Sequence, residues 1–94
     1  MLKVAGWKVY PNEIEEVLAA HPDVAECAVT KIHDQTLGEV PRAVVVLQEK
    51  SLVSPGELRR YCSQRMAKYK VPAVVDFVDE LPKAPSGKIL FQNL

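Results

Sequence analysis

The apolar run Ala43–Leu47 constrains the fold of this chain more than any other feature of its sequence. Its five consecutive residues, Ala-Val-Val-Val-Leu, are typical of a strand that is buried on both faces. Residues 24–32 form a second run rich in small and β-branched residues, and Asp34–Glu39, with Gly38, predicts a turn between the two runs. We therefore expect 24–32 and 40–47 to form an antiparallel pair at the centre of a sheet.

Two segments carry the start and stop signals of helices. In the first, Pro11 suits the first helical position, three acidic residues follow at 13, 15 and 16, and His21-Pro22 predicts the end. In the second, Ser54-Pro55-Gly56-Glu57 has the form of a capping box. We expect this second helix to run to about Tyr69.

The remaining segments complete a small α+β domain. Residues 1–9 alternate loosely around Gly6, which predicts a short N-terminal β-hairpin, and residues 73–78 predict a last strand. The order β-β-α-β-β-α-β-loop describes a small mixed or antiparallel sheet with two main helices packed on it. We expect a single domain over residues 1–94, because a chain of this length has little room for a second core or a deep substrate cavity.

Charge and composition exclude several classes of function. Twelve Lys and Arg balance twelve Asp and Glu, so no overall field would attract nucleic acid. No stretch approaches the roughly 20 apolar residues of a membrane span, and Met1–Tyr10 does not resemble a signal peptide. Cys27 and Cys62 lie far apart and match no disulfide or zinc pattern. We therefore expect reduced thiols, no metal site and a cytoplasmic protein.

The strongest candidate for chemistry is the loop that runs from Leu81 to Lys88. Pro82 and Pro85 fix φ and stiffen the loop, and Gly87 lets the backbone turn where other residues would clash. Lys88 would then present a compact positive charge to a phosphate or a carboxylate. The segment is not a P-loop, which needs glycine in place of Pro82 and Ser or Thr after the lysine. The alternative is a solvated lysine near a flexible end.

Two further segments are weaker candidates. The segment that contains Lys3, Gly6 and Trp7 is either a structural turn or a hairpin that approaches a ligand. Residues 59–70 carry five positive charges and no acid, and they form either a solvated helix face or a phosphate contact. The five charged residues are Arg59, Arg60, Arg65, Lys68 and Lys70.

Together, these features resemble the C-terminal domain of the adenylate-forming superfamily, which includes acyl-CoA synthetases, peptide-synthetase adenylation domains and luciferases. The segments that carry the resemblance are Gly6–Leu18, His21–Val29, Gly38–Ala43, Tyr69–Pro72 and Leu81–Ile89. Within the first, Val-Tyr-Pro-Asn-Glu-Ile-Glu most resembles the long-chain fatty acyl-CoA synthetase branch. The chain departs from the family after Ile89, because Leu90–Leu94 lacks the basic residues and Leu-Arg ending that often follow.

The resemblance implies a ligase reaction in two steps. A carboxylate attacks the α-phosphate of ATP to give acyl-AMP and pyrophosphate, and the thiol of coenzyme A then displaces AMP. Lys88, supported by Gly87, falls on the catalytic lysine of the first step. For the second step the domain would rotate about a hinge, so that Lys3, Gly6 and Trp7 line the thiol tunnel.

The resemblance also implies that this chain is the mobile lid of a larger enzyme and is inactive alone. A large N-terminal adenylation domain would hold the acyl pocket and Mg²⁺, with ATP and coenzyme A as substrates. Arg65 and Lys70 would contact a phosphate group or a carrier protein. Two alternatives stay open, an adenylation domain that loads a carrier-protein phosphopantetheine and a stand-alone interaction module. An isolated lid would expose its partner face, which favours self-association.

Overall fold

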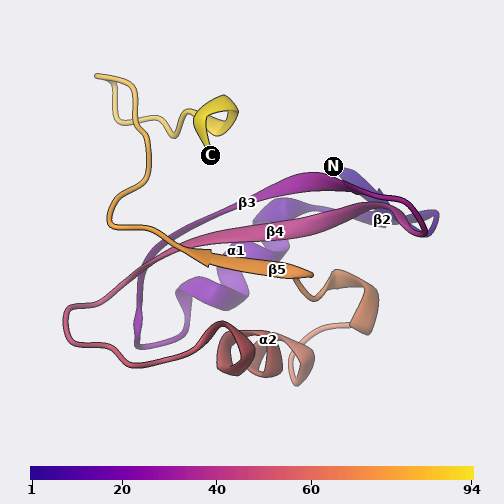
Figure 1. Ribbon diagram of the computed structural model, residues 1–94, viewed down its shortest axis with the longest axis horizontal. Helices are drawn as coiled ribbons and strands as arrows, with labels where there is room; N and C mark the ends of the chain where they lie inside the picture. The colour runs from indigo at the N-terminus through magenta and orange to yellow at the C-terminus, as the bar shows by residue number, and fades with distance from the viewer.

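The chain folds into five strands and two α-helices, with two single turns of 3₁₀ helix (Figure 1). The structure is a computed structural model and describes all of residues 1–94. In chain order the elements are β1 (Leu2–Val4), β2 (Trp7–Val9), α1 (Pro11–Ala19), β3 (Val24–Asp34), β4 (Gly38–Leu47), α2 (Pro55–Ser63), η1 (Lys68–Lys70), β5 (Val74–Phe77) and η2 (Phe91–Asn93). The predicted α+β class and the predicted order of elements are both confirmed.

All five strands form one sheet around β4. β3 pairs with β4 in antiparallel, with Val29 opposite Ala43, and β5 pairs with β4 in parallel, with Val75 opposite the same Ala43. β1 pairs in antiparallel with β2 and meets β4 only at Val4, opposite Gly38. The predicted antiparallel pair exists, but only β4 is central. β3 is an edge of the sheet, because β1 and β5 both pair with the other side of β4.

The apolar run of β4 is buried on both faces, as its sequence predicts. Ala43 and Val45 belong to the main core, which includes residues of α1 and α2, whereas Val44 belongs to a smaller core shared with the C-terminal segment. None of these three side chains is more than 1% exposed. Figure 1 shows the C-terminal segment on the side of the sheet opposite α2. The two layers that β4 requires are therefore the helices and this C-terminal segment.

The helices begin where their sequences predict, but the second ends early. α1 starts at Pro11, and α2 starts after Ser54, whose hydroxyl accepts a hydrogen bond from the backbone N–H of Glu57 at 3.1 Å. The prediction that α2 continues to about Tyr69 is wrong, because the helix ends at Ser63. Ala67 is extended, with φ −62° and ψ 148°, and the chain then makes the separate turn η1. This break turns the chain so that Tyr69 packs against the main core.

The predicted N-terminal hairpin is formed by β1 and β2 with a two-residue turn. Ala5 and Gly6 both have positive φ, 50° and 88°, which is the sign pattern of a type I′ hairpin turn. The backbone N–H of Ala5 donates to the carbonyl oxygen of Leu37 at 2.8 Å, so the turn is tied to the β3–β4 turn beside it. The hairpin is therefore held in a defined place at the end of the sheet.

Candidate functional site

The segment that carries Lys88 is a short hairpin. Leu90 N–H donates to the carbonyl oxygen of Pro82, and Ala84 N–H donates to that of Lys88, each at 2.8 Å. The tip is a turn closed by a 2.8 Å bond from Gly87 N–H to the Ala84 carbonyl oxygen, and Gly87 has φ +90°. A turn followed by a left-handed glycine is a common hairpin connection. The loop predicted from the sequence is thus a hydrogen-bonded support for Lys88.

This C-terminal hairpin is anchored at its base and open at its tip. Leu81 is 4% exposed in the smaller core, and Ile89 packs against the same core. Lys83 forms an ion pair with Glu26 of β3. Lys88 is exposed and forms no ion pair or side-chain hydrogen bond within the chain. Of the two lysines on this hairpin, Lys88 alone keeps its charge available for a group outside the domain.

The other predicted residues, Lys3, Gly6 and Trp7, lie together on the N-terminal hairpin. The backbone N–H of Lys3 donates to Oε1 of Glu39 at 2.9 Å, whereas the Lys3 residue is exposed. A Cβ atom added to Gly6 would meet nothing within 4 Å, so the tip of the turn faces open space. Trp7, the only tryptophan in the chain, is 59% exposed. An exposed tryptophan beside an open turn is suited to contact with a ligand.

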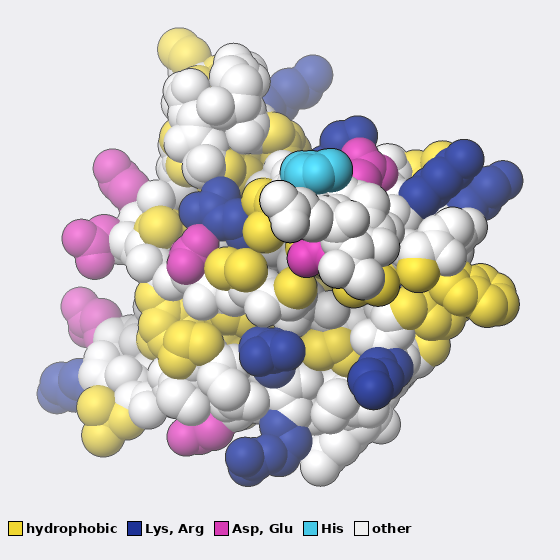
Figure 2. Space-filling view, turned by 45° about the vertical axis from the view of Figure 1, so that its right-hand side comes forward, with side chains coloured by type: hydrophobic (Ala, Val, Ile, Leu, Met, Phe, Trp, Pro, Cys, Tyr) yellow, Lys and Arg dark blue, Asp and Glu magenta, His cyan; other side chains and the backbone are white.

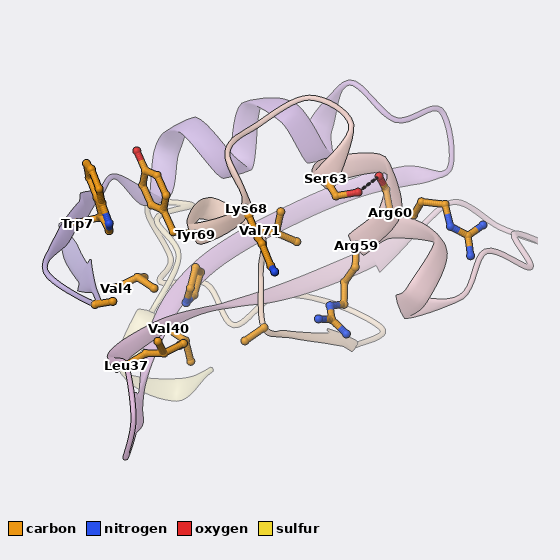
Figure 3. Close-up of a pocket in the computed structure, with 13 residues that line it drawn as sticks. Val4, Trp7, Leu37, Val40, Arg59, Arg60, Ser63, Lys68, Tyr69 and Val71 are labelled. Carbon is orange, nitrogen blue, oxygen red and sulfur yellow. Dashed lines mark hydrogen bonds between the residues drawn. The ribbon is translucent and has the colours of Figure 1, made fainter.

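Trp7 forms one wall of a cleft of about 700 Å³ (Figure 3). Its ring stacks on Tyr69, with 5.1 Å between the ring centroids and 20° between the planes. Val4, Leu37 and other apolar side chains complete the lining. Sequence reasoning missed this cleft, because its two aromatic residues are 62 positions apart. Two features of the sequence pointed to the cleft: the position of Trp7 in the predicted hairpin and the segment resembling the family that begins at Tyr69.

Three of the five predicted basic residues line the cleft, namely Arg59, Arg60 and Lys68. Figure 3 shows the Arg59 and Lys68 side chains pointing into the space between the labelled residues, whereas Arg60 points away from it. Figure 2 shows Lys and Arg side chains around apolar surface on this face of the molecule. The cleft therefore combines an aromatic and apolar lining with positive charge, which suits a ligand that has both a planar ring and phosphate groups.

Arg65 and Lys70, the two residues expected to contact a phosphate or a carrier protein, are not among the residues that line the cleft. The Arg65 guanidinium lies 3.6 Å from the centroid of the Tyr61 ring and donates to the Tyr61 carbonyl oxygen at 3.0 Å. Lys70 Nζ lies 3.0 Å from Oε2 of Glu13, and this bond raises the pKa of Lys70. Each of the two charges therefore has a partner inside the domain.

The cysteines and the acidic residues form no further site. Cys27 and Cys62 are free thiols, and burial raises the pKa of each to about 11. Thiols with such a pKa are almost entirely protonated near neutral pH and are poor nucleophiles. No group of three or more His, Cys, Asp and Glu side chains is placed to hold a metal ion. Neither helix is long and apolar enough to span a bilayer.

The two candidate sites lie at opposite ends of the molecule. Figure 1 places the Lys88 hairpin and the β1–β2 hairpin at the two ends of the long axis, along which the domain extends 36 Å. A single small ligand does not reach both sites at once. A function that uses both must use them in turn, or for different parts of a larger ligand.

Comparisons with known proteins identify the family of this chain. The chain matches the family described as AMP-binding enzyme C-terminal domain over residues 13–88. It is 47% identical over 89 residues to 2-succinylbenzoate–CoA ligase of Geobacillus kaustophilus, covering 95% of this chain and 18% of that protein. It is also 47% identical over 94 residues to long-chain-fatty-acid–CoA ligase of Yersinia pestis, covering 100% of this chain and 16% of that protein.

A solved structure gives the same result in three dimensions. The chain superposes on o-succinylbenzoate CoA synthetase of Bacillus subtilis, in complex with an acyl-adenylate intermediate, with a TM-score of 0.86 and 45% identity. The match covers 94% of this chain and 18% of that one. This chain therefore belongs to the AMP-binding enzyme C-terminal domain family. It spans less than a fifth of the length of these relatives.

Proposed function

We propose that this chain is the mobile lid of an AMP-forming acyl-CoA ligase and that its two hairpins act in successive half-reactions. The observation that carries the proposal is the separation of an unpaired, exposed Lys88 from the Trp7–Tyr69 cleft. One site offers a single positive charge and the other offers a surface for a nucleotide. A domain rotation between the steps would bring each site to the reaction centre in turn.

In the first step, Lys88 would act through its charge. The substrate carboxylate attacks the α-phosphorus of ATP, a new P–O bond forms, and pyrophosphate leaves with the electron pair of the broken P–O bond. The Lys88 ammonium orients the carboxylate and offsets the negative charge that builds up between it and the α-phosphate. A preorganised charge of this kind contributes about 3 kcal/mol of transition-state stabilisation, or roughly 100-fold in rate.

In the second step, the N-terminal hairpin would face the reaction centre. The thiolate of coenzyme A attacks the acyl carbonyl carbon, the thioester forms, and AMP leaves. Gly6 lets the thiol-bearing arm pass close to the backbone, and Lys3 and Trp7 line its path. The nucleotide end of coenzyme A would lie in the cleft, with its ring near Trp7 and Tyr69 and its phosphates near Arg59 and Lys68.

The use of the two hairpins in successive steps also indicates the partners of this chain. ATP, acyl-AMP and coenzyme A would bind between this chain and a large N-terminal domain. This chain has no cluster of three or more metal ligands, so a Mg²⁺ ion that accompanies ATP would be held by the larger domain and the phosphates. The free thiols of Cys27 and Cys62 support a cytoplasmic location. Two relatives at 47% identity are named for different acids, so the proposal covers acyl-CoA ligases as a class and assigns no acid.

A chimera tests the proposal. Residues 1–94 would replace the segment that they match in the Bacillus subtilis synthetase, and each half-reaction would be measured separately. Lys88→Ala should lower pyrophosphate release by about 100-fold or more and leave thioester formation from supplied acyl-AMP unchanged, because its charge acts only in the first step. Equal loss of both half-reactions would show instead that Lys88 supports the structure.

Lys83→Ala is the matched control. It also removes one positive charge from the same hairpin, but Lys83 is already paired with Glu26. We expect at most a few-fold change in pyrophosphate release. A loss as large as that of Lys88→Ala would mean that the reaction responds to the general charge of the hairpin.

Transfer to a carrier protein has less support than transfer to coenzyme A. In that alternative, Arg65 and Lys70 would form an acidic carrier's docking face, but both have partners within the domain. The relatives reported above are named as CoA ligases. Loading of a carrier protein by the chimera, at a rate similar to that with coenzyme A, would reverse this preference.

A further inference from the structure

The 3₁₀ turn η1 depends on contacts outside itself for its position. Its backbone bonds run from Lys70 N–H to the Ala67 carbonyl oxygen at 2.9 Å and from Val71 N–H to that of Lys68 at 3.3 Å. No side chain caps its start. A single turn with two backbone bonds is not stable by itself in water. The side chains that η1 sends to other elements therefore decide where Tyr69, its middle residue, is held.

One of these side chains forms an ion pair across the domain. Lys70 Nζ lies 3.0 Å from Oε2 of Glu13, 57 residues earlier in the chain, and the Lys70 side chain is only 28% exposed. Glu13 lies in the first turn of α1, which starts at Pro11, two residues after β2 ends. Glu13 is therefore tied closely to Trp7, the first residue of β2. The ion pair joins η1 to the segment that also carries Trp7.

The aromatic stack joins the same two segments. Tyr69 precedes Lys70 on η1, and Tyr69 stacks on Trp7 with 5.1 Å between centroids. The segment from Trp7 to Glu13 therefore meets η1 twice, through two rings and through two charges. Two adjacent links restrict rotation of η1 in a way that either link alone would not.

We propose that Glu13 and Lys70 are positioning residues for the cleft, and that their ion pair keeps the Tyr69 ring against Trp7. This inference rests on the proposed binding of coenzyme A in the cleft for its functional consequence, although the positioning itself does not. Lys70, expected from the sequence to contact a phosphate, acts through Tyr69 and touches no ligand. The ion pair is partly exposed, and such pairs contribute little to global stability, so variants that lack it should still fold.

Tryptophan spectroscopy on the 94-residue chain tests the positioning. Trp7 is the only tryptophan, so its emission and its quenching by acrylamide report on the surroundings of this one ring, of which Tyr69 is part. Glu13→Gln and Lys70→Met should each change the emission and raise the quenching constant about 1.5- to 2-fold, toward the value of Tyr69→Leu, with little change in Tm. Spectra and quenching that coincide with those of the unchanged chain would overturn the proposal.

Two further variants separate positioning from a general effect of charge. Glu26→Gln removes the ion pair with Lys83 at the other end of the molecule and should leave the emission of Trp7 unchanged. The double variant Glu13→Lys with Lys70→Glu reverses the pair and should restore at least half of the change in quenching. Failure of this restoration, with both single variants perturbed, would mean that each side chain acts independently, and the proposal would be wrong.

The chimera supplies the functional readout. Glu13→Gln and Lys70→Met should raise the KM for coenzyme A about 3- to 10-fold and leave pyrophosphate release unchanged, since the cleft serves only the second step. If Tyr69→Leu itself leaves this KM unchanged while the spectra respond as expected, the proposed coenzyme A site is wrong and the positioning stands. If Tyr69→Leu raises the KM and the ion-pair variants change neither KM nor spectra, the positioning is wrong and the coenzyme A site stands.

Discussion

The two hairpins at the ends of this domain share a turn glycine and differ in how they are attached. Gly6 has φ 88° and Gly87 has φ 90°, so both tips use a conformation that other residues adopt at a cost. The N-terminal hairpin buries Leu2, Val4 and Val9 in the main core. It is held in addition by hydrogen bonds, including those to Glu39 and Leu37, and by the aromatic stack. The C-terminal hairpin is held by burial of Leu81 at its base and by the ion pair between Lys83 and Glu26, and it has no aromatic stack.

The difference in attachment suits the difference in what each hairpin presents. Hydrogen bonds and stacked rings are directional, so they fix the orientation of the N-terminal hairpin, whose backbone and Trp7 form a shaped surface. Burial is not directional, but Lys88 offers a charge, whose interaction falls only gradually with distance. A charge at the end of a long side chain tolerates small movements of its support. A backbone that a ligand must pass closely does not tolerate such movements.

The largest effect is expected from a substitution at the base of the C-terminal hairpin. Leu81→Ala should cost about 2–3 kcal/mol, near the low end for a buried leucine, because its core is small and can relax. The loss should be local, so amide exchange at Ala84 and Leu90 should speed up by about 30-fold or more. Exchange at Ala5, in the N-terminal hairpin, should not change.

Leu52→Ala is the control for this substitution, because Leu52 is 94% exposed. It should leave amide exchange in both hairpins unchanged, since it removes no buried surface. Equal acceleration at Ala5 and Leu90 in Leu81→Ala would show that the two hairpins unfold together and that the comparison is unsound.

An intermediate effect is expected when either turn glycine is replaced by alanine. The added Cβ of Gly6→Ala or Gly87→Ala meets nothing within 4 Å, so the cost is the left-handed backbone alone, about 1–2 kcal/mol in each case. The Tm of thermal unfolding should therefore fall by a similar amount in both variants. In the chimera, Gly87→Ala should slow mainly pyrophosphate release and Gly6→Ala mainly thioester formation. The opposite assignment, or the same loss in both half-reactions, would contradict the division between the hairpins.

The smallest effect concerns pH and the N-terminal hairpin alone. The backbone N–H of Lys3, and then the Lys31 ammonium at 3.0 Å, stabilise the Glu39 carboxylate and hold its pKa below the usual 4.5. The stabilisation is therefore present above pH 4.5 and is lost as pH falls through the lower pKa of the folded state. Glu39→Gln should lower Tm slightly at pH 7, and the difference should shrink toward pH 3. A difference that is constant with pH would mean that the carboxylate charge is not involved.

Local sequence was sufficient for most of the fold and for the glycine turn before Lys88, but it predicted a stiff loop there and not the hydrogen-bonded hairpin. Two glycines with positive φ, a capping serine at Ser54 and the apolar run at Ala43–Leu47 act on near neighbours or on the periodicity of one strand. The end of α2 was not predictable in this way. No proline or glycine lies between Ser63 and Tyr69, and the helix stops there because the chain must turn to bring Tyr69 onto the core.

The sequence by itself determined the order of the elements and the two glycine turns, because each depends on short-range backbone preference. Only the tertiary structure decided that β4 alone is central, that Trp7 meets Tyr69, and that Lys70 is paired with Glu13. Those contacts join residues about 60 positions apart. Their partners are chosen by the packing of α1, β2 and η1 in space, and no spacing along the chain encodes them.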